Sequence, residues 1–183
     1  MKSRLVMLAA AILACGAIAT GCTPTRTTKS AGEQVDDSTL TAKVKTELAR
    51  DPATSAHRID VETFRGDVQL NGFVPSAEMK SEATRVARNV KGVQHVSNNL
   101  RVGDGDRSAG EVVDDTVITA KVKTALAADS TVAAHEVNVE TRAGVVQLAG
   151  FVDNSAQKQQ ATEVTRRIAG VKQVDNQLEV KQR

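Results

Sequence analysis

Apolar positions recur along the chain in two rhythms, and each rhythm predicts one kind of secondary structure. Leu40, Val44 and Leu48 are four residues apart, which places them on one face of an amphipathic helix. Two runs of alternating apolar and polar residues follow, at 59–63 and 68–70, and they predict two strands. The first part of the chain that can form a core therefore begins as a helix followed by two strands.

Glycines mark the turns and ends of these elements. Gly66 lies between the two runs and predicts a hairpin turn, because glycine accepts a positive φ without steric cost. Gly72 lies late in the second strand, where we expect a bulge or a close approach of a helix. A second helix follows with four residues directed inward: Met79, Ala83, Val86 and Val90. Gly92 fits the C-cap of that helix, and alternation over 96–102 predicts a third strand.

Acidic residues precede the first helix. We expect Asp36, Asp37 and Ser38 to supply its N-cap, where negative charge also favours the helix dipole. Asp114 and Asp115 are expected to do the same further along the chain.

The whole pattern occurs twice. Residues 30–102 align with 108–180 at a constant offset and without a gap, and more than half of the aligned residues are identical. The apolar positions of the first helix recur as Ile118, Val122 and Leu126. The chain is therefore two copies of one small domain, placed at 34–102 and 112–180 with a linker at 103–111.

The order helix, strand, strand, helix, strand predicts an α+β fold in each copy. Two helices must cover one face of a three-stranded sheet, because neither kind of element can bury its apolar side alone. A domain of this size has a small core, so packing against the twin domain would add stability. Such a contact would use apolar positions left exposed on either sheet.

Residues 1–21 have the features of a secretory signal peptide. Lys2 and Arg4 precede an apolar stretch from Leu5 to Ala19, and small residues stand directly before Cys22. The alternative is a retained membrane anchor, but the stretch is shorter than the roughly 20 residues needed to span a bilayer.

The segment Ile18 to Cys22 resembles the lipobox of bacterial lipoproteins. The resemblance implies that the Cys22 thiol carries acyl chains and that Cys22 is the first residue of the mature protein; Cys15 is a second candidate. Residues 22–33 then form a flexible tether, and Thr23-Pro24 resembles the pattern that sorts lipoproteins to the outer membrane.

Several motifs present in both copies resemble the BON domain, a module of bacterial periplasmic and outer-membrane proteins. They are Thr41–Thr46 and Thr119–Thr124, the hairpin glycines, Gly72–Val74 and Gly150–Val152, and Gly92-Val93 and Gly170-Val171. With the lipobox, the chain is similar to dual-BON outer-membrane lipoproteins. Without it, the chain is similar to the osmotically inducible periplasmic protein of that family. The resemblance implies phospholipid binding, envelope integrity and stress resistance, and no reaction.

The resemblance also implies roles for particular residues. Six glycines are expected at turn and packing positions: Gly66, Gly72, Gly92, Gly144, Gly150 and Gly170. In the lipoprotein relatives the lipid-facing surface lies around the first helix of the second domain. Here that helix is Asp115 to Ala127, and it would present Val117, Ile118, Lys121 and Lys123 to lipid. The alternative is that Ile118 belongs to the core and the lysines form a solvated face.

Composition and charge argue against several classes of binding site. The chain lacks Trp and Tyr and has three Phe, which argues against an aromatic-lined ligand pocket and against base stacking with nucleic acid. Lys2 and Arg4 account for the whole net charge of +2, so the chain after the leader is neutral. The copy at 30–102 has equal numbers of acidic and basic residues, whereas the copy at 108–180 has more acidic than basic ones. Global charge therefore cannot drive binding to anionic membranes.

No constellation of catalytic residues is apparent. His57 and His135 occupy the same repeat position, so duplication accounts for the pair. No Gly-x-Ser-x-Gly elbow or phosphate-binding loop occurs, and Asp104 and Asp106 lack the other ligands of a calcium loop. We expect no enzyme activity, no metal and no cofactor.

These observations predict a non-enzymatic, lipid-anchored envelope protein that faces the periplasm from the outer membrane. Its partners would be membrane phospholipid, through the acyl anchor and the second domain, or envelope proteins, and not nucleic acid. The alternative is a soluble periplasmic osmotic-stress protein or chaperone.

Overall fold

Each copy folds into two helices and a mixed sheet, as the two apolar rhythms predict. The computed structural model describes residues 31–55, 59–103 and 108–182. The predicted leader, Cys22 and the tether up to residue 30 lie outside the described residues. Domain 1 consists of α1 (Ala31–Arg50), β1 (Ile59–Phe64), β2 (Asp67–Val74), α2 (Ala77–Arg88), β3 (His95–Asn98) and β4 (Arg101–Val102). Domain 2 consists of α3 (Ala109–Ala128), a short 3₁₀ helix η1 (Ala134–Glu136), β5 (Val137–Arg142), β6 (Val145–Val152), α4 (Ser155–Arg166) and β7 (Gln173–Val180).

The two sheets have the same topology. In domain 1, β2 lies in the centre, antiparallel to β1 and parallel to β3 and β4. In domain 2, β6 is antiparallel to β5 and parallel to β7. The registers correspond, with Val61 opposite Leu70 and Val139 opposite Leu148. The third strand differs, because it is split into β3 and β4 in domain 1 and continuous in domain 2.

Each core lies between the helices and one face of the sheet. Val44, Leu70 and Leu100 are fully buried at its centre in domain 1, as are Val122 and Leu148 in domain 2. Among the residues whose burial the structure describes, the members of both cores lie within 40–178, so a chain that starts at residue 30 contains both of these cores.

The helices begin earlier than predicted. The α3 helix starts at Ala109 and is capped by Ser108, whose hydroxyl accepts the Glu111 amide while the Glu111 carboxylate accepts the Ser108 amide. These hydrogen bonds lower the pKa of Glu111, and the one from the Ser108 backbone amide has the largest effect. The predicted N-caps at Asp36 and Asp114 are therefore wrong, and the first turn of α3 lies within the predicted linker.

The second helix of domain 1 ends before the glycine predicted to cap it. Asn89 is the C-cap of α2, and Gly92 takes its positive φ of 107° in the turn that follows. Gly170 has the same place after α4, with a φ of 97°.

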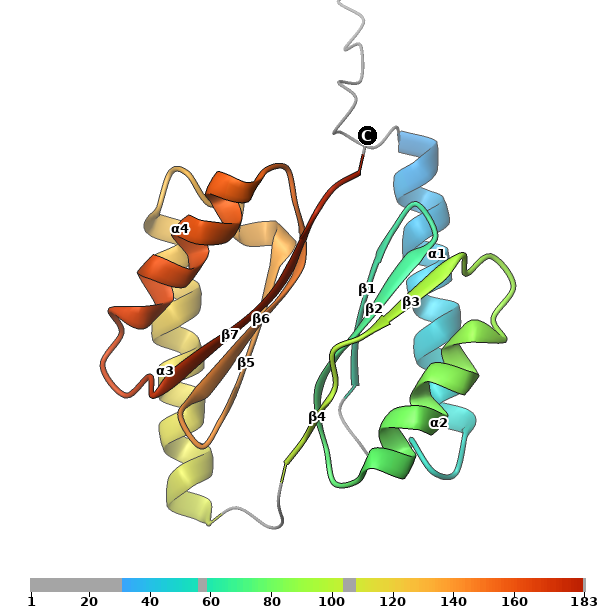
Figure 1. Ribbon diagram of the computed structural model, residues 1–183, viewed down its shortest axis with the longest axis horizontal. Helices are drawn as coiled ribbons and strands as arrows, with labels where there is room; N and C mark the ends of the chain where they lie inside the picture. Colours follow the sequence, from blue (N-terminus) through green and yellow to red (C-terminus); the bar gives the residue numbers. More distant parts are fainter. Residues whose placement is uncertain (1–30, 56–58, 104–107, 183) are drawn as a thin grey trace, which may run out of the picture.

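The two sheets face each other, with the helices of each domain on the outside (Figure 1). Two buried glutamines join them through a reciprocal set of hydrogen bonds. The Gln147 side chain accepts the Gly72 amide at 2.8 Å and donates to the Asn99 carbonyl at 2.7 Å. The Gln69 side chain does the same to Gly150, at 2.9 Å, and to the Gln177 carbonyl, at 3.4 Å. Because these are equivalent positions, the interface has pseudo-twofold symmetry.

Aromatic contacts and an ion pair between Arg101 and Asp175, at 3.0 Å, also join the two domains. The rings of Phe64 and Phe151 are stacked with centroids 5.5 Å apart. At the symmetry-related place, the Arg142 guanidinium lies 5.9 Å from the centroid of Phe73. We predicted that apolar residues of the sheets would join the two domains, and the phenylalanine pair does so. The hydrogen bonds from glutamine side chains to the backbone of the other domain were not predicted.

Candidate functional site

A buried aspartate under the hairpin turn organises the same surface in both domains. The Asp37 carboxylate accepts the amides of Arg65 and Gly66 at 2.8 and 3.2 Å. Asp115 accepts those of Ala143 and Gly144 at 2.9 and 3.0 Å. In each turn both central residues have positive φ, the geometry of a type I′ hairpin turn. The aspartates predicted as helix caps therefore hold the hairpin against the first helix.

In domain 2, a hollow lies between the N-terminal half of α3, this turn and the loop before β7. Its volume is about 320 Å³. Apolar atoms of Val117, Ala143 and Ala169 line it together with Lys121 and Lys172. We predicted lipid binding on this surface of α3, which forms one side of the hollow.

Domain 1 has the equivalent hollow with different chemistry. Its volume is about 440 Å³, and it is lined among others by Thr39, Lys43, Arg65 and Lys91. Thr39 stands where domain 2 has Val117, and Arg65 and Lys91 stand where domain 2 has alanine. The duplicated hollow is thus more cationic in domain 1 and more apolar in domain 2.

Exposed valines extend the apolar surface of domain 2 along α3. Val113 is 62% exposed and Val117 is 45% exposed, and Val112 is also exposed. Val113 and Val117 are one turn apart, so they share a face of the helix. The N-terminal end of α3 projects beyond the sheet (Figure 1).

Three of the four predicted lipid-facing residues, Val117, Ile118 and Lys121, line the hollow. Val117 and Lys121 are exposed there. Ile118 is 7% exposed and belongs to the hydrophobic core, where the Cβ of an alanine at position 170 would meet it at 2.9 Å. Lys123 does not line the hollow, because two residues along a helix rotate the side chain by about 200° from Lys121.

The six glycines all have positive φ. Gly150 is the most constrained in space, because an added Cβ would lie 2.0 Å from the Glu136 carbonyl oxygen. At Gly144 an added Cβ would lie 3.0 Å from the Gly170 carbonyl oxygen. These positions are fixed by the backbone of the fold rather than by a ligand.

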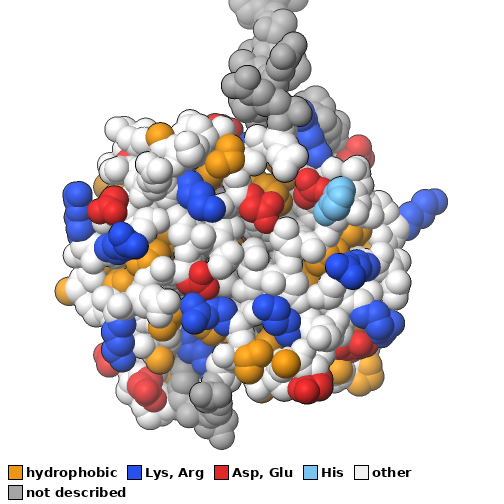
Figure 2. Space-filling view, viewed as in Figure 1, with side chains coloured by type: hydrophobic (Ala, Val, Ile, Leu, Met, Phe, Trp, Pro, Cys, Tyr) orange, Lys and Arg blue, Asp and Glu red, His pale blue; other side chains and the backbone are white. Residues whose placement is uncertain are grey.

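The remaining surface has mixed charge. Figure 2 shows basic and acidic side chains interspersed over one face rather than gathered by sign. Within the described ranges, no group of three or more His, Cys, Asp or Glu side chains is placed to hold a metal ion. The helices of that part of the chain are also too short or too polar to cross a membrane.

Both domains match one family of known proteins. The family model of the BON domain matches residues 36–104 and 114–182. The chain belongs to the BON domain family. Among its relatives is osmotically-inducible protein Y of Escherichia coli, which is 41% identical over 82% of this chain and 75% of its own length.

Two further relatives also contain most of both BON domains. The outer membrane lipoprotein DolP of Haemophilus influenzae is 36% identical over 90% of this chain and 84% of its own length. The 21 kDa hemolysin of Actinobacillus pleuropneumoniae is 36% identical over 80% of this chain and 75% of its own length. None of these three names is that of an enzyme.

Sequence reasoning missed several residues of this arrangement. Gln69 and Gln147 could have been found, because a polar residue that recurs between two buried positions in both copies indicates a specific partner. Val113 and Lys172 gave no such signal, because their exposure depends on where α3 starts and how the loop before β7 folds.

Proposed function

We propose that this BON protein is a non-enzymatic, lipid-anchored protein of the outer membrane that faces the periplasm. Acyl chains on Cys22 would hold it in the membrane, and its role would be to maintain the integrity of the envelope under stress. The likeness to an outer membrane lipoprotein supports the anchor. The exposed valines of α3 support a direct contact of domain 2 with phospholipid.

The valine surface carries this part of the proposal. Val113 and Val117 are exposed on one face of the N-terminal half of α3, where they would enter the interfacial region of a bilayer without unfolding the core. Lys121 lies one turn further along and lines the same hollow, and in this proposal it meets lipid phosphates. Ile118 lines the hollow from the core side and is 7% exposed, whereas Lys123 lies outside the hollow.

Vesicle co-sedimentation of residues 30–183 tests the contact. We expect V113S/V117S to reduce binding to phosphatidylglycerol vesicles about tenfold or more, since each buried valine contributes on the order of 1 kcal/mol. V102S/V180S is the matched control, because Val102 and Val180 are 49% and 41% exposed at strand ends. Equal binding of both double variants would remove domain 2 as the lipid-binding surface.

Fatty-acid labelling of cells tests the anchor. The wild type should incorporate label and fractionate with the outer membrane, whereas Cys22→Ala should not. A clean deletion should sensitise cells to detergents and large antibiotics. An unlabelled, soluble wild type would refute the anchor, and unchanged permeability would refute the role in envelope integrity.

A soluble periplasmic osmotic-stress protein or chaperone is the second candidate. The 41% identity to osmotically-inducible protein Y favours it. It predicts no label at Cys22 and loss of survival under osmotic shock, without a change in detergent sensitivity.

A further inference from the structure

The cationic hollow of domain 1 borders a second groove of the same domain. This groove lies between α1 and α2 and has a volume of about 590 Å³. Val86 and Val90, both nearly buried, line it between its polar side chains. Lys43 and Lys91 line both the groove and the hollow, so they mark the junction of the two.

The other cations of the groove have carboxylate partners. Arg50 pairs with Glu47 at 2.9 Å. Arg85 pairs with Asp51 at 3.6 Å and forms a closer pair with Glu82. These pairs place the Glu47 and Asp51 carboxylates against arginines of the groove.

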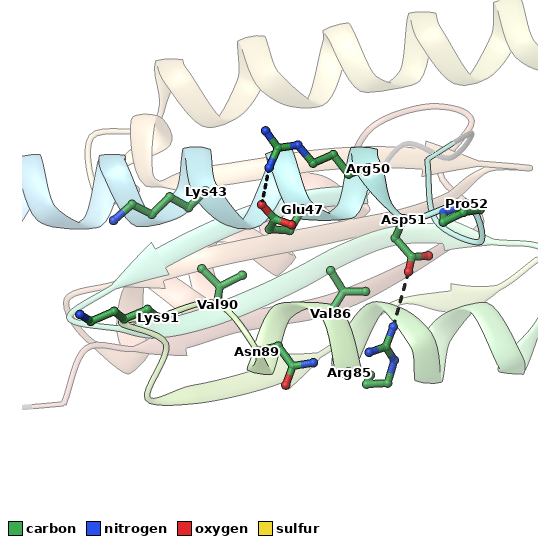
Figure 3. A pocket seen from close by; sticks show the side chains of 10 residues that line it. All are labelled: Lys43, Glu47, Arg50, Asp51, Pro52, Arg85, Val86, Asn89, Val90 and Lys91. Atoms are coloured by element: carbon green, nitrogen blue, oxygen red, sulfur yellow. Dashed lines mark hydrogen bonds and ion pairs between the residues drawn. The ribbon is translucent and has the colours of Figure 1, made fainter.

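Lys43 and Lys91 differ from these arginines. Over residues 31–55, 59–103 and 108–182, neither lysine side chain has a hydrogen bond or an ion pair. Figure 3 shows both at the same end of the groove, one from α1 and one from the loop after α2, with their side chains extended in the same direction. Two neighbouring ammonium groups repel each other unless an anion lies between them.

The acidic residues of the adjoining hollow leave this junction positive. The Asp37 carboxylate is committed to the two amides of the hairpin turn. Asp36 is exposed at the edge of the hollow. Asn89 lines the groove and Gln94 lines the hollow, and both offer amide donors.

Domain 2 has lost this arrangement. Lys43 corresponds to Lys121, but Lys91 corresponds to Ala169, and Arg50 corresponds to Ala128. The junction is thus a feature of domain 1 and does not follow from the BON fold alone.

We propose that the junction of Lys43 and Lys91 binds a phosphate group, with the rest of the ligand lying in the groove between α1 and α2. Phosphate suits the place because two ammonium groups on one side provide charge-assisted hydrogen bonds to a compact anion. The phosphate belongs either to a lipid headgroup at a membrane surface or to a soluble phosphorylated molecule. The site is separate from the valine surface of α3 and does not depend on it.

Titration of residues 30–183 by ¹H–¹⁵N NMR tests the proposal. Inorganic phosphate and glycerol 3-phosphate should shift the amides around Lys43 and Lys91, and salt should weaken the effect. K43Q/K91Q should reduce the affinity about tenfold or more. The matched control K45Q/R88Q, which removes two exposed cations from the same domain outside both hollows, should leave it unchanged.

Vesicles separate the two sources of phosphate. A K43Q/K91Q defect on phosphatidylglycerol vesicles, with no defect on phosphatidylcholine vesicles, identifies a lipid headgroup. Shifts with glycerol 3-phosphate and no vesicle defect identify a soluble ligand, and both results support the site. Equal losses in K43Q/K91Q and K45Q/R88Q, or shifts with an acidic peptide but not with phosphate, would overturn it. The V113S/V117S variant reports separately on domain 2.

Discussion

Domain 1 and domain 2 have the same backbone plan but differ in what lines the hollow beside the hairpin. Asp37 and Asp115 hold the hairpin in the same way, and the same glycines take positive φ. The rim residues have diverged, from Thr39 to Val117 and from Lys91 to Ala169. The residues that set the backbone of the turn are thus the same in both copies, whereas the residues around the hollow differ. The difference predicts two surfaces with different partners on one scaffold.

The largest effect should come from a glycine that domain 2 cannot replace. Gly150→Ala places a Cβ 2.0 Å from the Glu136 carbonyl oxygen at a φ of 126°. We expect a loss of roughly 3 kcal/mol or more in the free energy of unfolding, measured by denaturant titration of residues 30–183. Gly110→Ala is the control, since an added Cβ there meets nothing within 4 Å. An unchanged midpoint for Gly150→Ala would mean that β6 and η1 separate at little cost.

The next largest effect tests whether the two hairpins are truly equivalent. Asp115→Ala removes the acceptor of two turn amides, and we expect a loss of about 2–3 kcal/mol. Asp37→Ala should cost a similar amount, because its hydrogen bonds are the same. Asp114→Ala, at an exposed neighbour, should change stability by less than about 0.5 kcal/mol. Unequal losses for the two buried aspartates would break the equivalence of the domains.

A smaller effect tests the coupling of the domains. Gln69→Ala and Gln147→Ala each remove two hydrogen bonds across the interface, at about 1–2 kcal/mol per variant. Calorimetry of the double variant should resolve two unfolding transitions in place of one. Gln159→Ala, on the exposed face of α4, is the control and should keep the wild-type profile. A single transition in the double variant would show that the remaining contacts between the domains, among them the Arg101–Asp175 ion pair and the stacked phenylalanines, suffice.

The smallest effect concerns pH and the Lys181 side chain of domain 2. Domain 1 has no equivalent of this side chain, because Gly103 stands at the corresponding position. The Lys181 ammonium contacts Asp153 at 2.7 Å, pairs with Glu136 and lies 5.8 Å from the Phe64 ring. Burial lowers the pKa of Lys181, but together the two carboxylates raise it above its ordinary value.

A raised pKa stabilises the fold below the unfolded value of about 10.4, and this contribution disappears as pH rises through the folded pKa. The wild type should therefore lose stability above about pH 10.4. Lys181→Met should lack this component, as measured by denaturant titration at several alkaline pH values. Parallel pH profiles for the two proteins would contradict the assignment.

The amino-acid sequence by itself determined the duplication, the order of elements and the faces of the cores. Apolar spacing is a local property of the chain, and it alone placed Val44, Leu70 and Ala83 correctly in the interior. The glycines also located the hairpin turns, because glycine takes a positive φ at little steric cost.

The tertiary structure alone decided the roles of polar residues. Asp37 was predicted to cap a helix, because acidic residues favour the first turn of helices. Instead, α1 begins earlier, and the Asp37 carboxylate accepts hydrogen bonds from the hairpin amides. Gln69 gained its role only when a second sheet faced the first. Lys43 and Lys91 lie far apart in the sequence and share a surface only because the loop after α2 returns beside α1. The partners of a polar side chain depend on which segments the fold brings together, and the spacing of residues along the chain does not predict these partners.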